Sequence, residues 1–197
     1  MEVKQYFENV KKVYDRINTR EVETMIHHIL EAYNNRKMIY VIGNGGSAAN
    51  ASHFAEDLSK GAITDQNVEK RIRAISLAEN VPFITASAND TGYENIFVSQ
   101  LITFANPGDY LIAISGSGNS KNIIKAVEYA KIRRIKVIGV TGYDGGKLKE
   151  LSDISVHVPL HEMCTIESIH SIIFHYITGH IREIITGEKF GDSCFNN

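Results

Sequence analysis

Cysteine and proline are scarce in this chain of 197 residues, and tryptophan is absent. The 2 cysteines, Cys164 and Cys194, are too few for a disulfide framework, which fits a reducing compartment, so we expect a cytoplasmic location. With only 3 prolines and 43% hydrophobic residues, the composition excludes a disordered or low-complexity chain. A chain of this length suits one domain with a sizeable hydrophobic core.

The chain also lacks a surplus of charge and a long apolar run. Its formal net charge of −2 gives no basic surplus, so general binding to nucleic acid is not expected. No stretch approaches the roughly 18 apolar residues of a membrane-spanning helix. Residues 1–20 are mixed and charged, without the apolar segment of an export signal. We therefore expect neither a membrane span nor an exported protein.

Short apolar runs alternate with helical patterns along the chain. Strands are expected at residues 38–42, 73–77, 111–114, 136–140 and 154–158, with helices between them and a long final helix over about 165–185. Residues 1 to about 35 are typical of two helices, with Thr19 as the N-cap of the second. The alternation predicts an α/β fold, a doubly wound five-stranded parallel sheet flanked by helices, with an N-terminal helical segment. We expect one domain over residues 1–187 and a tail at 188–197.

A glycine-rich turn follows the first strand and leads into a helix of small residues. Such a turn presents free backbone N–H groups to an anion, so residues 43–47 predict a phosphate site. Gly43, Gly45 and Ala48 also match the spacing G-x-G-x-x-A of dinucleotide sites. The acidic residue that such sites carry about 20 residues further on is missing here, which disfavours a dinucleotide.

A second loop of serine and glycine follows the third strand. Ser115, Ser117 and Ser120 offer three hydroxyl donors to a single phosphate without an arginine. The alternative, an ordinary Ser/Gly turn that ends in an N-cap, is weakened because two such loops follow two different strands. The carboxyl ends of parallel strands meet at one edge of the sheet, so the two loops together favour a monophosphate site.

Two ionisable side chains lie on the helix behind the first loop. His53 and Asp57 are four residues apart, so they share one helix face, in the arrangement of an active site. Glu56 is an alternative active carboxylate, although its position turns it about 100° around the helix. On the final helix, Glu167 and His175 are eight residues apart on adjoining parts of one face, and His170 and His180 are expected to point elsewhere.

The motifs at residues 43–47, 53–58, 114–120 and 141–146 resemble those of the sugar isomerase (SIS) domain, more narrowly its phosphoheptose isomerase branch. The resemblance covers residues 5 to 186. It implies the SIS fold and a ketose–aldose isomerase that converts sedoheptulose 7-phosphate to D-glycero-D-manno-heptose 7-phosphate. It implies six substrate-binding residues, of which the first four bind the phosphate and the last two lie near the sugar: Ser47, Ser115, Ser117, Ser120, Asn44 and Asp90.

The same resemblance implies a metal, commonly zinc, held by two histidines, a glutamate and a glutamine. These positions fall on His53, Asp57, Glu167 and His175, so Asp replaces Glu and Glu replaces Gln. Two imidazoles and two carboxylates still suit Zn²⁺ or another divalent ion. Glu167 is expected to contact the substrate as well. The arginine that the family carries two residues before the glutamine is Thr165 here.

The chemistry implied by the resemblance moves a proton between C1 and C2 of the sugar through an enediol. Asp57 is the expected base and His175 the expected acid, with the metal polarising the carbonyl group. Because two ligands differ from those of the family, two alternative functions remain. One is a non-catalytic SIS module that binds a sugar phosphate or a protein partner, and the other is an isomerase for another phosphosugar. The resemblance further implies a homotetramer whose site is shared between subunits.

Overall fold

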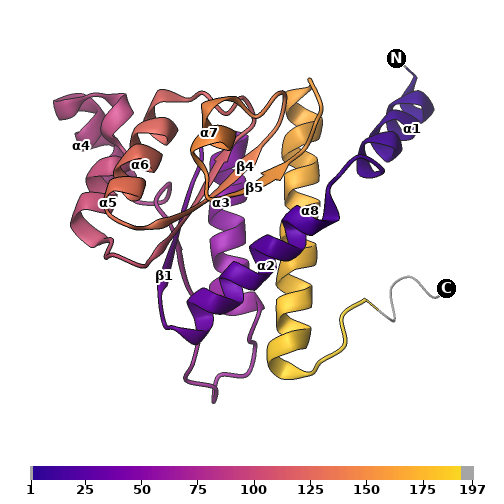
Figure 1. Cartoon of the computed structure of the whole chain (residues 1–197), viewed down its shortest axis with the longest axis horizontal. Coiled ribbons are helices and arrows are strands. Elements are labelled where there is room, and N and C mark those ends of the chain that lie inside the picture. The colour runs from indigo at the N-terminus through magenta and orange to yellow at the C-terminus, as the bar shows by residue number, and fades with distance from the viewer. Residues whose placement is uncertain (1, 192–197) are drawn as a thin grey trace.

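The structure is a computed structural model that describes residues 2–191. Strands alternate with helices along the chain (Figure 1). The strands are β1 (Met38–Ile42), β2 (Arg73–Ser76), β3 (Tyr110–Ser115), β4 (Lys136–Thr141) and β5 (Ile154–His157). The α-helices are α1 (Val3–Tyr14), α2 (Thr19–Asn34), α3 (Gly46–Glu56), α4 (Val81–Thr91), α5 (Val98–Phe104), α6 (Lys121–Ile132), α7 (Gly146–Leu151) and α8 (Met163–Thr186), with a π-helical turn η1 (Asp57–Gly61) and a 3₁₀ turn η2 (Tyr93–Asn95).

The five strands form one parallel sheet in the order β2-β1-β3-β4-β5. The chain therefore runs outward from β1 to β2, returns to pair β3 with the other edge of β1, and continues to β5. The loops that follow β1 and β3 leave the sheet in opposite directions and open a crevice between them, which is where doubly wound sheets bind ligands. The predicted fold is confirmed, and both predicted phosphate loops lie at this crevice.

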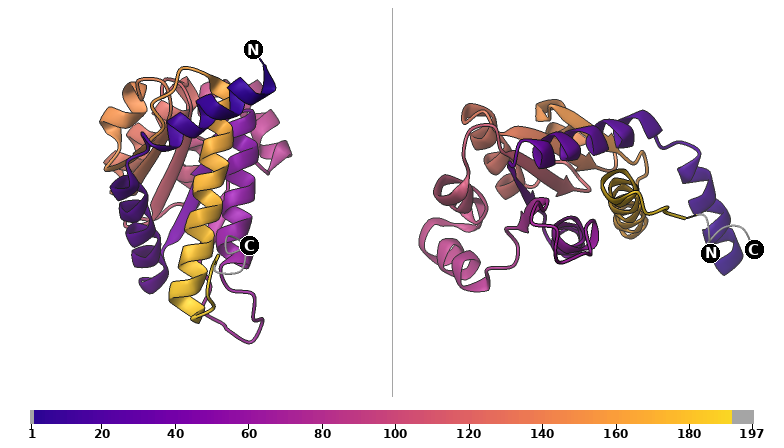
Figure 2. Two further views of the ribbon diagram at one scale, coloured as in Figure 1. Left: turned by 90° about the vertical axis from the view of Figure 1, so that its right-hand side faces the viewer. Right: turned by 90° about the horizontal axis from the view of Figure 1, so that it is seen from below.

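Helices cover both faces of the sheet and enclose two hydrophobic cores (Figures 1 and 2). One core joins α2, α3 and α8 to the sheet, and in it Phe54 of α3 stacks on Phe174 of α8 with ring centroids 4.3 Å apart. The other core joins α5, α6 and α7 to the opposite face. All residues of β3 are buried, as is usual for a central parallel strand covered on both sides. Helices α3 and α8 lie side by side, so side chains of both reach a common surface (Figure 2).

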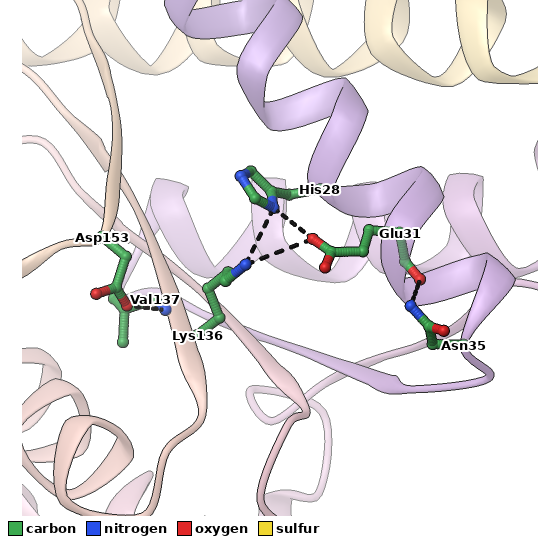
Figure 3. A network of polar contacts seen from close by, with 6 residues as sticks. All are labelled: His28, Glu31, Asn35, Lys136, Val137 and Asp153. Carbon is green, nitrogen blue, oxygen red and sulfur yellow. Dashed lines mark hydrogen bonds and ion pairs between the residues drawn. The ribbon is translucent and has the colours of Figure 1, made fainter.

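A polar network joins α2 to the amino ends of the strands, opposite the crevice (Figure 3). The Glu31 carboxylate lies 2.8 Å from His28 Nδ1 and 3.4 Å from Lys136 Nζ, at the first residue of β4. Hydrogen bonds from the side chains of Tyr110 and His28 lower the pKa of Glu31 to about 2, although burial acts in the other direction. The network therefore contains a carboxylate that stays ionised in moderate acid.

The ends of several elements differ from the prediction because side chains cap them. Asn18, not Thr19, is the N-cap of α2, since its side chain accepts a hydrogen bond from the Arg20 N–H while Thr19 is already helical. Helix α8 begins at Met163, two residues early, because Glu162 accepts hydrogen bonds from the next turn. Strands β2 and β5 are one residue shorter than predicted and β3 is two longer. Of the predicted tail, residues 192–197 lie outside the described residues.

Helix α1 projects from the body of the molecule (Figures 1 and 2). It contacts the start of α8 through Tyr6, whose hydroxyl lies 3.0 Å from the Thr165 hydroxyl. Val3 and Phe7 on α1 are 72% and 65% exposed. Over residues 2–191, no helix combines the length and apolar character needed to cross a lipid bilayer.

Candidate active site

A pocket of about 210 Å³ lies in the crevice between the loops that follow β1 and β3. It is lined by Asn44, Gly45, Gly46, Ser47, Ile114, Ser115, Gly116, Ser117, Ser120, Met163 and Glu167. The first turn of α3 begins here, and the partial positive charge of a helix N-terminus favours an anion. Among the described residues that line it there is no lysine or arginine, so any anion would be held by neutral donors.

Glycine is needed in the first loop for two physical reasons. Gly45 has φ 55° and ψ −124°, a conformation that a residue with a Cβ rarely adopts. At Gly43 a Cβ would collide with the backbone carbonyl of Ser47. The tight turn brings Ser47 into the pocket, where only 4% of its surface is exposed.

Asn44 is fixed at the edge of the pocket by two side chains that the sequence did not indicate. Its amide exchanges two hydrogen bonds with the amide of Asn122, with N–O distances of 2.9 and 2.8 Å. Tyr93 donates its hydroxyl hydrogen to Asn44 Oδ1 at 3.0 Å. Met163, also unforeseen, lines the pocket from α8. Nothing in the sequence marks these residues, because each reaches Asn44 or the pocket only through the tertiary fold.

Three of the four predicted metal ligands lie together where α3 and α8 run side by side. Asp57 Oδ2 is 3.7 Å from His53 Nε2 and 3.8 Å from His175 Nε2. The two imidazole rings are nearly perpendicular, with centroids 4.9 Å apart. The side chain of Asp57 is 19% exposed, whereas those of His53 and His175 are about half exposed, at 54% and 52%. The group is therefore open to solvent on one side.

The π-helical turn η1 starts at Asp57 and was not predicted. It is closed by a hydrogen bond from the Ala62 N–H to the Asp57 carbonyl at 2.8 Å. π-turns insert an extra residue into a helix and are frequent at functional sites. Here the turn begins at the residue whose carboxylate faces both imidazoles.

The His53, Asp57 and His175 group has the composition of a divalent cation site. Its donor atoms all lie within 4.8 Å of one another. Two imidazole nitrogens and one carboxylate oxygen suit Zn²⁺, and three protein ligands with an open position are typical of catalytic zinc. The residues present therefore fit the cation that the resemblance implies.

Glu167, the fourth predicted ligand, is not part of this group. Its carboxylate lies in the pocket, with Oε1 3.4 Å from Ser47 Oγ. The structure thus places Glu167 with the predicted substrate-binding residues and apart from the predicted metal ligands.

Two other acidic residues lie away from the site. Asp90 is exposed on α4, accepts a hydrogen bond from Asn89 at 2.7 Å, and is not among the residues that line the pocket. Its contact with the sugar stays a prediction. Glu56 is exposed and its carboxylate lies 3.4 Å from Lys60 Nζ, so the geometry favours Asp57 over Glu56 as the active carboxylate.

His170 was expected to point away from His175, and it lies completely buried beneath α8. Its Nε2 donates to the Thr141 carbonyl at 3.2 Å, which ties α8 to the end of β4. Burial lowers the pKa of His170 to about 4, so the ring stays neutral at physiological pH. The sequence did not indicate this partner, because an isolated histidine on an amphipathic helix gives no sign of which group its ring will meet.

The fold and the site define an α/β domain with a pocket suited to an anion at its switch point and a group suited to a divalent cation on the adjoining helices. Comparison with known proteins narrows this class to one family. A family model described as the SIS domain matches residues 5–142. A phosphoheptose isomerase from Aneurinibacillus thermoaerophilus is 38% identical over 184 residues, 92% of this chain and 91% of the relative. One from Helicobacter pylori strain P12 is 41% identical over 152 residues, 77% of this chain and 78% of the relative.

Solved structures agree with the sequence comparisons. The phosphoheptose isomerase of Neisseria gonorrhoeae superposes with a TM-score of 0.83 at 31% sequence identity, covering 91% of this chain and 96% of that one. The chain belongs to the SIS domain family, in its phosphoheptose isomerase branch. This confirms the resemblance drawn from the loop motifs, and it identifies an enzyme of the phosphosugar isomerase class.

Proposed function

We propose that the enzyme converts sedoheptulose 7-phosphate to D-glycero-D-manno-heptose 7-phosphate. The observation that carries the proposal is the placement of the Asp57 carboxylate between two imidazoles, on the same pair of helices whose first turns line the anion pocket. Ser47 and Asp57 are ten residues apart, about 15 Å along the helix at 1.5 Å per residue. This separation suits a substrate whose phosphate and reacting carbons lie at opposite ends of a sugar chain.

The phosphate is bound by neutral donors. Ser47, Ser115, Ser117 and Ser120 supply hydroxyl groups, and the first turn of α3 adds backbone N–H groups and a favourable dipole. Asn44, fixed by Asn122 and Tyr93, is positioned for a sugar hydroxyl next to the phosphate. The expected contact of Asp90 with the sugar belongs to the same proposal.

The reaction moves one proton between carbons and one between oxygens. Asp57 removes a proton from C1 of the ketose and returns it to C2, which passes through an enediol. His175 gives a proton to the carbonyl oxygen at C2 and takes up the proton of the C1 hydroxyl as C1 becomes the aldehyde carbon, so it returns to its starting state. Asp57 Oδ2 faces both imidazoles, so we assign the carbon proton transfer to Oδ1.

A divalent cation, Zn²⁺ by the resemblance, would be held by His53, Asp57 and His175, with Glu167 as the predicted fourth ligand. When bound, it supplies a positive charge that polarises the carbonyl group and stabilises the negative charge of the enediolate. We further propose a cytoplasmic homotetramer, in which a second subunit covers the open side of the group. Cell fractionation tests the location.

An assay with sedoheptulose 7-phosphate and added zinc tests the function and distinguishes the two candidate bases. Asp57→Asn should lower kcat by at least about a hundredfold, the usual contribution of a general base. Glu56→Gln removes the same charge at the neighbouring residue. This variant should retain activity, because the Glu56 carboxylate of the wild type lies beside Lys60. Absence of turnover by the wild-type enzyme would overturn the function. The reverse order of the two variants would overturn only the choice of base.

A further inference from the structure

The Glu167 carboxylate occupies the anion pocket of the free protein. Its Oε1 lies 3.4 Å from Ser47 Oγ, which is in position to donate a hydrogen bond. A Cβ at Gly46 would collide with both carboxylate oxygens of Glu167, so the carboxylate rests directly on the first residue of α3. The side chain thus takes the place at this helix N-terminus that an anionic ligand would take.

The backbone of Glu167 is fixed beside the pocket. Asn50 of α3 donates a hydrogen bond to the Glu167 carbonyl at 2.9 Å, which fixes α8 beside the first turns of α3. Gly46, which has no side chain, leaves room for the carboxylate in this position. The pocket offers hydroxyl and backbone donors, and no lysine or arginine of the described chain lines it to balance a second negative charge.

We propose that Glu167 is an internal competitor of the substrate phosphate: its carboxylate must leave the pocket before the phosphate can enter. The inference rests on the proposed function, because it requires that the pocket bind phosphate. Two anions side by side among neutral donors repel each other strongly, and a pocket of about 210 Å³ brings them close. A glutamine at this position would have the same size without the charge.

The cation site gives the displaced carboxylate a second partner. Glu167 lies two helical turns before His175 on the same helix, and the His53, Asp57 and His175 group supplies three ligands for a divalent ion. A bound cation attracts the carboxylate out of the pocket, so cation and phosphate each strengthen the binding of the other. By linkage the two effects are equal in size.

Binding of a phosphate monoester to metal-free protein tests the competition directly. Methyl phosphate, which carries no sugar, is titrated into chelator-treated wild-type protein and Glu167→Gln, and its dissociation constant is measured by NMR. We expect Glu167→Gln to bind methyl phosphate about tenfold more tightly. Glu183→Gln is the matched control, since it makes the same change on the same helix, about 24 Å away at 1.5 Å per residue. It should bind like the wild type.

The possible outcomes separate the inference from the function. Equal affinity, or weaker binding by Glu167→Gln, overturns the competitor role and leaves the proposed function intact. Absence of binding to every variant overturns the phosphate pocket, and the competitor role with it. Thermal unfolding checks that Glu167→Gln is folded. If it is not, Glu167→Ala replaces it and should show the same gain in affinity for methyl phosphate.

A second titration, in the presence of stoichiometric zinc, tests the coupling. Zinc should improve methyl phosphate binding by a larger factor in the wild type than in Glu167→Gln, because only the wild type has a carboxylate to withdraw from the pocket. An equal factor in the two proteins would overturn the link between cation and phosphate.

Discussion

Two carboxylates on the adjoining helices α3 and α8 have different surroundings, and the difference decides what each can do. Asp57 lies between His53 and His175, a setting suited to proton transfer and to holding a cation. Glu167 lies against the N-terminus of α3 among hydroxyl groups, a setting suited to an anion. We therefore propose that the same functional group takes part in catalysis at Asp57 and takes the place of an anionic ligand at Glu167.

His170 should make the protein less stable in mild acid. Its pKa is about 4 in the folded protein and 6.5 in an ordinary environment, so between these values the unfolded chain binds the additional proton. Stability from this residue is complete above about pH 6.5 and falls as pH decreases toward 4, by about 1.4 kcal/mol per pH unit within that range.

Replacement of His170 by phenylalanine, His170→Phe, checks this sign. The variant should lose about 1–3 kcal/mol at neutral pH, because the Thr141 carbonyl loses its donor. Its free energy of unfolding should depend less on pH between 6.5 and 4 than that of the wild type. Urea unfolding at a series of pH values measures both effects, and an unchanged slope would contradict the assignment.

Sequence reasoning identified His53, Asp57 and His175 because helical spacing and family motifs both mark them, and the structure brings them together. It assigned Glu167 both to the substrate and to the metal, because a side chain on the shared surface of two helices can turn toward either site; the structure places it in the pocket. Asn122 and Tyr93 were missed. Each reaches Asn44 from a distant part of the chain, which no local pattern records.

At the scale of elements, the network of His28, Glu31 and Lys136 fastens α2 to β4 far from the pocket (Figure 3). The pKa of Glu31 is lowered to about 2 from 4.5, so its contribution to stability is present above about pH 4.5 and is lost as pH falls toward 2. Glu31→Gln should cost up to about 1 kcal/mol near neutral pH, since the pair is partly exposed.

Acid unfolding measured by circular dichroism checks the role of Glu31. Between pH 4.5 and 2, the stability of Glu31→Gln should change less than that of the wild type, while its affinity for methyl phosphate at neutral pH stays the same. A loss of phosphate affinity would show that the network also acts on the pocket at the opposite end of the sheet.

Strands were predicted more reliably than the ends of helices. The apolar runs of β1 and β4 are buried on both faces, so their signal is continuous and strong. The N-cap of α2 and the start of α8 depend on one hydrogen-bonding side chain each, and several neighbouring residues could have supplied it. The π-turn at Asp57 contacts α8 and has no local sequence signal.

At the scale of the whole molecule, the alternation of strands and helices predicted a parallel sheet, but it did not determine the strand order. The order β2-β1-β3-β4-β5 puts the switch point between β1 and β3, and that position brings two loops separated by about 70 residues into one pocket. The two loop motifs were informative together because both follow strands that the fold makes neighbours.

The apolar surface left open by the single chain supports the proposed homotetramer. Val3 and Phe7 are exposed on the projecting helix α1, and Ile172 and Tyr176 are 49% and 47% exposed on α8, on either side of His175 in the sequence. Ile172 lies three residues before His175 on the same helix, so a neighbouring subunit that covers it would also approach the open side of the His53, Asp57 and His175 group. Assembly and activity should then depend on each other.

Phe7→Ser tests this dependence without changing the catalytic group. Burial of a phenylalanine side chain contributes about 1.5–3 kcal/mol, and the loss recurs in each subunit. We expect light scattering to show four chains for the wild type and smaller species for the variant at the same concentration. The isomerase activity of the variant should fall on dilution and recover at high protein concentration, because the mass action that restores the assembly also restores the site. A wild-type protein that is monomeric and fully active would refute the tetramer, and would show that one chain completes the site alone.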